Sequence, residues 1–170
     1  MATHTTGEAD SATRSADQPA AGSEYVSDVE LEQHELELLL DEVRRIVHGD
    51  QKCKPPLATR LVELLDELCE RLGMVFALKE TGGYLEDVVL TAPPLSERAE
   101  ALRSEHLPLF GELCHLIAQC DDDFEHRRWR HLRTFLETSF DDFCRHFQAH
   151  QAGEAELVQQ AFTDDVGVGD

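Results

Sequence analysis

The sequence predicts an all-α fold, an antiparallel up-down four-helix bundle over about residues 27–170. Apolar residues recur three and four positions apart in four segments, the spacing that places them on one face of a helix. No segment alternates apolar and polar residues as a strand would. Gly-Asp, Gly-Gly and Pro-Pro pairs separate the segments, so short connections should join helices that run in opposite directions.

The first two helices are predicted from a start signal and from breakers. Ser27 and Glu30 have the spacing of a capping box, which opens a helix that runs to about His48. The Pro55-Pro56 pair belongs to the connection, and the second helix starts near Leu57. The apolar stripes of these helices are Leu36, Leu39, Leu40, Val43, Ile46 and Val47, then Leu61, Leu64, Leu65, Leu68, Leu72, Val75 and Phe76.

The last two helices follow a segment, 84–90, that is predicted to continue the second helix. The hydroxyl of Ser96 is expected to cap the third helix. The fourth should start after the Asp121-Asp122-Asp123 run and extend to about Phe162. Their stripes are Ala99, Leu102, His106, Leu109, Leu113, Leu116 and Cys120, then Leu132, Phe135, Leu136, Phe140, Phe143, Phe147, His150, Glu154, Leu157, Val158 and Ala161.

Composition limits the classes of partner. Residues 1–26 are polar and acidic with almost no large apolar groups, so this segment should be disordered. The 170 residues include 15 basic and 35 acidic side chains, a formal charge of −20. Such a charge argues against a nucleic acid or an anionic membrane as partner. A solvated acidic surface is the simplest interpretation, with a basic protein partner or adaptation to high salt as alternatives.

The cysteines and the hydropathy favour a cytoplasmic protein. Five cysteines form an odd set without a Cys-x-x-Cys pair, so neither a zinc motif nor a disulfide framework is expected. Reduced thiols suit the cytoplasm. No run of 18 apolar residues suggests a membrane span, and the first residues lack the pattern of a secretion signal.

A possible metal-ligand pair lies on the apolar face of the fourth helix. His150 and Glu154 are four residues apart and therefore stack on one face. His106 lies within the third stripe, whereas His34 lies opposite the first stripe and should be a surface residue. Helical bundles hold iron with inward-pointing histidines and carboxylates. A lone histidine on an apolar face is more often a hydrogen-bonded core residue, and Lys79, at the end of the second stripe, either snorkels to water or pairs with a carboxylate.

The order of motifs along the chain resembles the hemerythrin-like family, the HHE cation-binding domains, over about residues 29–170. The resemblance implies a four-helix bundle with two irons. One histidine comes from each of the first and third helices, and a His-x-x-x-Glu pair from each of the second and fourth. The motifs are Leu39-Leu40-Asp41-Glu42-Val43, Phe76-Ala77-Leu78-Lys79-Glu80-Thr81-Gly82-Gly83-Tyr84-Leu85, Leu102-Arg103-Ser104-Glu105-His106, and the tail 150–170 with its Asp164-Asp165-Val166-Gly167 turn.

The resemblance implies that only part of the family's ligand set is present. His106, His150 and Glu154 match the ligands of the third and fourth helices. The remaining three positions fall on Gln33, Val75 and Lys79, none of which matches.

The loss of ligands determines the function expected from the sequence. Lys79 places a positive charge where a metal would lie and could pair with Glu154, so an intact di-iron centre and reversible oxygen binding are not expected. The leading hypothesis is a non-catalytic structural or interaction bundle with an unidentified protein partner. The alternative is a single iron or zinc ion on His106, His150 and Glu154 for sensing or metal handling. Glu80 is a possible additional carboxylate.

A third hypothesis is a bundle that shares only the fold with the metal-binding proteins. Enzymatic function is not predicted, because the sequence has no Ser-His-Asp arrangement, no GxxxxGK and no GxGxxG after a strand.

Overall fold

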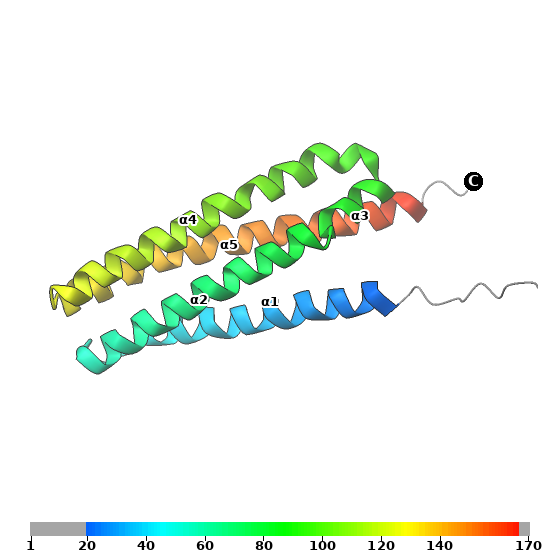
Figure 1. The fold of residues 1–170 in the computed structure, drawn as a ribbon. Helices are drawn as coiled ribbons and strands as arrows, with labels where there is room; N and C mark the ends of the chain where they lie inside the picture. Colours follow the sequence, from blue (N-terminus) through cyan, green and yellow to red (C-terminus); the bar gives the residue numbers. More distant parts are fainter. Residues whose placement is uncertain (1–19, 167–170) are drawn as a thin grey trace, which may run out of the picture.

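The computed structural model describes residues 20–166, and these residues form helices joined by short connections. The elements are α1 (Ala20–Val47), α2 (Pro55–Thr81), α3 (Tyr84–Thr91), the 3-10 turn η1 (Pro93–Leu95), α4 (Ser96–Glu125) and α5 (Trp129–Val166). No strand occurs among them, so the all-α prediction is confirmed. The four long helices lie along a common direction, and the short α3 lies near the end where α4 begins (Figure 1).

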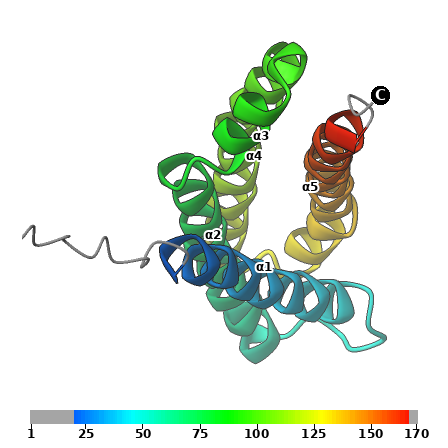
Figure 2. The same cartoon turned by 90° about the vertical axis from the view of Figure 1, so that its right-hand side faces the viewer.

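Figure 2 shows how the long helices are arranged when the molecule is viewed from one end. Their buried apolar side chains form the core. Leucine and phenylalanine side chains dominate this core because they bury the most apolar surface per residue. A smaller apolar cluster lies where α3 packs between α4 and α5. The large cluster includes Leu36, Leu65, Leu72, Leu113, Phe140, Phe143 and Phe147, and the smaller includes Leu85, Val88, Leu102, Leu157 and Ala161.

A polar layer separates the two apolar clusters. On α4, Leu102 belongs to the smaller cluster and Leu109 to the larger, and His106 lies between them. On α5, Phe147 belongs to the larger cluster and Leu157 to the smaller, and His150 and Glu154 lie between them. The fold therefore places a few polar groups inside the bundle, out of contact with water.

The helix α1 begins earlier than the sequence predicts. It starts at Ala20 rather than Ser27, so the proposed capping box of Ser27 and Glu30 lies inside the helix. Spacing alone does not distinguish a helix start from a helix interior, because the same residue pair fits both. Residues 1–19 of the predicted disordered segment lie outside the described residues.

The start of α4 also differs from the prediction. Leu95 precedes the helix and Ser96 is its first residue, with no side-chain hydrogen bond at this end. The backbone N–H of Ser96 is instead satisfied by the carbonyl oxygen of Pro93 in the preceding 3-10 turn. Ser96 has helical backbone angles, φ −59° and ψ −41°, whereas a capping residue has non-helical ones, so its hydroxyl does not cap the helix. The segment 84–91 is a separate helix, because Gly83 takes a left-handed conformation, with φ of 69°, between α2 and α3.

The turn between α4 and α5 corrects a further boundary. The acidic run 121–123 lies in the last part of α4 and not in the connection before the next helix, which was predicted to start directly after it. The helix α5 runs from Trp129 to Val166, past the predicted end near Phe162. Asp123 is completely buried and accepts hydrogen bonds from Arg128 Nε at 2.8 Å and from His131 Nδ1 at 2.6 Å. These bonds tie the end of α4 to the start of α5, a tertiary contact that local sequence patterns do not reveal.

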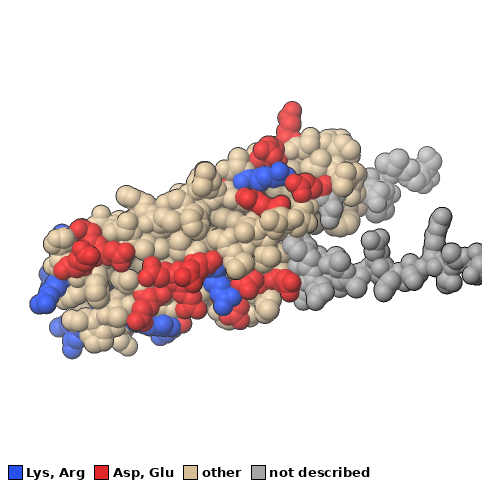
Figure 3. All heavy atoms as spheres, viewed as in Figure 1, with Lys and Arg blue, Asp and Glu red and all other residues tan. Residues whose placement is uncertain are grey.

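The surface agrees with the acidic composition. Figure 3 shows several patches of acidic side chains on the visible face, with basic side chains in smaller groups beside them. Among the described helices, none combines the length and the apolar character that a membrane crossing requires.

Candidate metal centre

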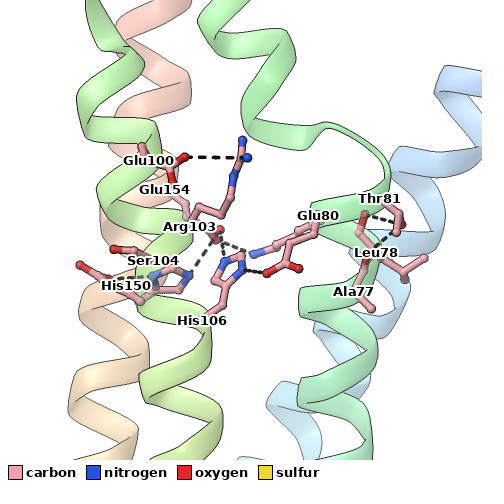
Figure 4. Close-up of polar contacts among 12 residues, drawn as sticks. Ala77, Leu78, Glu80, Thr81, Glu100, Arg103, Ser104, His106, His150 and Glu154 are labelled. Atoms are coloured by element: carbon pink, nitrogen blue, oxygen red, sulfur yellow. Dashed lines mark hydrogen bonds and ion pairs between the residues drawn. The ribbon is translucent and has the colours of Figure 1, made fainter.

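Four polar side chains from three helices make up the buried layer. Lys79 comes from α2, His106 from α4, and His150 and Glu154 from α5. Each is at most 6% exposed. Figure 4 shows the two imidazole rings and the Glu154 carboxylate directed toward one another. The apolar stripes carry these residues inward because each occupies a position where the helix faces the core.

Three atoms that could bind a metal ion converge in this layer, and none of them makes a hydrogen bond. His106 Nε2 lies 3.6 Å and His150 Nε2 3.4 Å from Glu154 Oε1. All three atoms lie within 4.8 Å of one another. None has a hydrogen-bond partner, although each is fully buried. Buried polar atoms in folded proteins nearly always have partners, so three orphaned atoms at one point call for an explanation such as an ion.

Carboxylates on the outer side of each ring fix the two histidines. His106 Nδ1 lies 3.0 Å from Glu80 Oε1, and His150 Nδ1 lies 2.9 Å from Glu105 Oε2. An ionised carboxylate only accepts hydrogen bonds, so in both rings Nδ1 carries the proton that is donated. In the neutral imidazole this leaves a lone pair on Nε2, which faces Glu154. Histidines that bind metals are held by a carboxylate in the same way.

Aromatic contacts further restrict the rings. Phe76 stacks on His106 with a centroid separation of 4.2 Å and an angle of 10° between the planes. The His106 and His150 rings meet edge to face, 5.1 Å apart. Phe76 also meets the His150 ring edge-on. The two Nε2 atoms are therefore held in place by packing as well as by hydrogen bonds.

Lys79 binds the other oxygen of the same carboxylate. Its Nζ donates to Glu154 Oε2 at 2.5 Å, and both side chains are 4% exposed. The sequence-based prediction that these residues pair across the bundle is confirmed, and the alternative that Lys79 reaches water is wrong. Glu154 thus has one oxygen neutralised by an ammonium group and one oxygen facing two histidines.

The electrostatics of the layer stabilise the charged form of Glu154. Burial alone would raise its pKa, but His106, His150 and Lys79 together hold the pKa well below its usual range. Burial lowers the pKa of His150, yet its contacts with the carboxylates of Glu154 and Glu105 outweigh that effect and raise the pKa above the ordinary value. The layer therefore presents an ionised carboxylate oxygen to the two imidazoles.

The other predicted positions lie outside this layer or bring no ligand to it. Gln33 is partly buried and His34 is exposed, as predicted for a surface histidine. Val75 is buried in the larger apolar cluster. Glu80 contributes by holding His106 rather than by joining the three donors. The role of Glu105 was missed, because no local pattern links it to a histidine on another helix.

A surface groove lies between α4 and α5, beside the layer. Its volume is about 550 Å³, and His150 forms part of its wall. The lining combines the apolar Leu102, Pro108 and Leu109 with the carboxylate of Glu105. An ion or a small molecule in this groove would lie beside His150, one of the three side chains whose atoms converge in the layer.

Comparisons of the chain with models of known protein families, with characterised proteins and with solved structures give no match. The resemblance to the hemerythrin-like family therefore rests on the sequence motifs alone.

Proposed function

We propose that the protein is a hemerythrin-like four-helix bundle that binds a single divalent iron or zinc ion through His106, His150 and Glu154, and that it acts in metal sensing or metal handling. The observation that carries the proposal is the convergence of three buried donor atoms that have no hydrogen-bond partners. Two imidazoles and one carboxylate are a donor set that suits both ions.

The distances between the donors support an ion at their centre. A tetrahedral zinc ion bound at about 2.0–2.1 Å holds its ligand atoms about 3.3–3.4 Å apart. The separations of 3.4 and 3.6 Å from Glu154 Oε1 to the two Nε2 atoms are close to that value. They are also too long for good N–H to oxygen hydrogen bonds, which are normally about 2.7–3.2 Å. The arrangement thus suits a shared ion better than direct bonding.

The balance of charge supports one ion rather than two. Lys79 carries one positive charge, and Glu154 with the two carboxylates that hold the histidines carries three negative charges. The net charge of −2 with neutral histidines matches one divalent cation. The ammonium group of Lys79 occupies the other side of Glu154, where it opposes a second cation.

A centre with three protein ligands, the number that converge among residues 20–166, suits sensing or handling. A zinc or iron ion with three protein ligands retains an open position for water or a small ligand. The groove beside His150 would give an ion or its carrier a route to the site. Within the bundle, Glu80 and Glu105 keep the histidines in the binding tautomer, and Lys79 keeps Glu154 ionised.

Titration of metal-free protein with Zn²⁺, and with Fe²⁺ in the absence of oxygen, tests the proposal. We expect a stoichiometry of one ion per chain by calorimetry and a rise in Tm with metal concentration. His106→Leu and His150→Leu should abolish both effects. His146→Leu is a matched control, because this exposed histidine lies on α5 and pairs with Glu112. Binding that survives in both His106→Leu and His150→Leu would refute the proposed site.

A second candidate, a metal-free structural or interaction bundle, is favoured by the short contact between Lys79 and Glu154. In this case the ammonium group of Lys79 substitutes for the metal beside Glu154. Lys79→Glu distinguishes the two candidates. A bundle that binds one ion takes up metal before and after the substitution, whereas the metal-free bundle takes it up only once the carboxylate is restored.

A further inference from the structure

A pair of cysteines meets between α2 and α4, away from the polar layer. Cys69 Sγ and Cys114 Sγ are 3.7 Å apart, and both side chains are partly buried. Ten residues separate Cys69 from Lys79 along α2, a distance of about 15 Å. The pair therefore does not take part in the proposed metal site, although both sulfurs lie on helices that supply its residues.

The other three cysteines lack this arrangement. Cys120 and Cys144 are buried, and burial raises the pKa of their thiols to about 12 and about 11. Cys53 is in the connection between α1 and α2. Within the described part of the chain, Cys69 and Cys114 are the pair of thiols in sulfur-to-sulfur contact.

We propose that Cys69 and Cys114 are a thiol oxidation site that forms an intramolecular disulfide and links α2 to α4. The oxidant is a small disulfide of the glutathione class. One cysteine thiolate attacks a sulfur of glutathione disulfide, which forms a mixed disulfide and releases a glutathione thiolate. The second cysteine thiolate then attacks the protein sulfur of the mixed disulfide and releases the second glutathione. The two protein thiols lose two electrons and two protons, and one glutathione disulfide becomes two glutathione thiols.

The geometry requires only a small movement for this step. Sulfur atoms in a disulfide are about 2.05 Å apart. The present contact of 3.7 Å must therefore shorten by about 1.65 Å, a movement shared between two side chains. Because the sulfurs come from different helices, the bond would close a long loop of the chain. Loops of this length give large stabilisation, so Tm should rise by about 10 °C.

The reaction should be slow at neutral pH. Burial, together with the hydrogen bond and charge of Cys114, raises the pKa of the Cys69 thiol to about 11. The thiolate is the reacting species, so a mildly alkaline medium accelerates the exchange. The site would respond to sustained oxidation rather than to a brief pulse.

Incubation of the reduced full-length protein with glutathione disulfide at mildly alkaline pH tests the proposal. Remaining thiols are alkylated, and peptides are mapped by mass spectrometry before and after reduction. We expect the alkylated cysteines to fall from five to three, a peptide crosslink between Cys69 and Cys114, and a rise in Tm that dithiothreitol reverses.

Serine variants sharpen the result. Cys69→Ser and Cys114→Ser should stop at the mixed disulfide with glutathione, whereas Cys144→Ser should still form the crosslink. Far-UV circular dichroism shows whether each variant folds, and the map of the unsubstituted protein decides the question if one does not. No reaction, arrest at the mixed disulfide in the unsubstituted protein, a link to another cysteine, or a crosslink without a rise in Tm would overturn the proposal.

Discussion

The buried ion pair between Lys79 and Glu154 provides the most informative substitution. In Lys79→Met the side chain keeps most of its length but loses the charge. Glu154 would remain ionised in the core, because its pKa is held well below the usual range by the histidines as well as by Lys79. Both side chains of the pair are 4% exposed, so water does not screen the remaining charge.

The expected loss of stability is large in metal-free protein. Removing one partner of a buried pair typically costs about 3–5 kcal/mol. For a domain of this size each kcal/mol corresponds to about 2–4 °C in Tm, so Tm should fall by about 10 °C. Saturating Zn²⁺ should restore much of the loss, because the ion neutralises the same carboxylate. The double variant Lys79→Met, Glu154→Leu should be near the unsubstituted protein in stability and should bind no metal.

Thermal unfolding followed by circular dichroism, with and without Zn²⁺, measures these effects. Arg71→Met is a matched control, because Arg71 and Glu32 form an ion pair of 2.6 Å whose side chains are 35% and 24% exposed. Loss of such a partly solvated pair should cost about 1 kcal/mol or less. If Lys79→Met were no more destabilising than Arg71→Met in metal-free protein, our account of the buried charge would be refuted.

Two further predictions concern other contacts. Glu105→Ala should weaken Zn²⁺ binding about 10–100-fold in a chelator competition assay, since His150 loses the partner that orients it, and Glu112→Ala should not. Asp123→Asn should lower the urea midpoint at neutral pH by an amount equivalent to about 2–3 kcal/mol. Burial raises the pKa of Asp123, but hydrogen bonds from His131 and Arg128 outweigh it and lower the pKa below 3.8. The ionised carboxylate therefore stabilises the fold at pH values above the pKa that Asp123 has in the unfolded chain. As the pH falls below that value, the difference in stability between the unsubstituted protein and Asp123→Asn should shrink. A difference in stability that stays the same at low pH would count against this cause.

The periodic apolar pattern was sufficient to predict the helical class and the residues that face the core. It placed His106, His150 and Glu154 on buried faces, and all three are buried. The pairing of Lys79 with Glu154 was predicted from the resemblance, which places both residues at ligand positions of one metal centre, and the two side chains do pair. Helix faces were predictable since each depends on spacing within one segment.

Contacts between helices were much less predictable. The hydrogen bond from His150 to Glu105 joins residues 45 positions apart, and no local pattern marks it. The boundary between α4 and α5 was placed too early, because the run 121–123 looks like a turn until Asp123 is seen buried against Arg128. The contact between Cys69 and Cys114 likewise depends on how α2 and α4 pack.

Elemental analysis of protein expressed with excess iron, manganese and zinc tests the central claim most directly. The account predicts about one ion of iron or zinc per chain in the unsubstituted protein and in His146→Ala, and close to none in His150→Ala. A metal content near zero in the unsubstituted protein, with unchanged Tm on addition of Zn²⁺ or Fe²⁺, would contradict the proposed site and favour the bundle in which Lys79 replaces the ion.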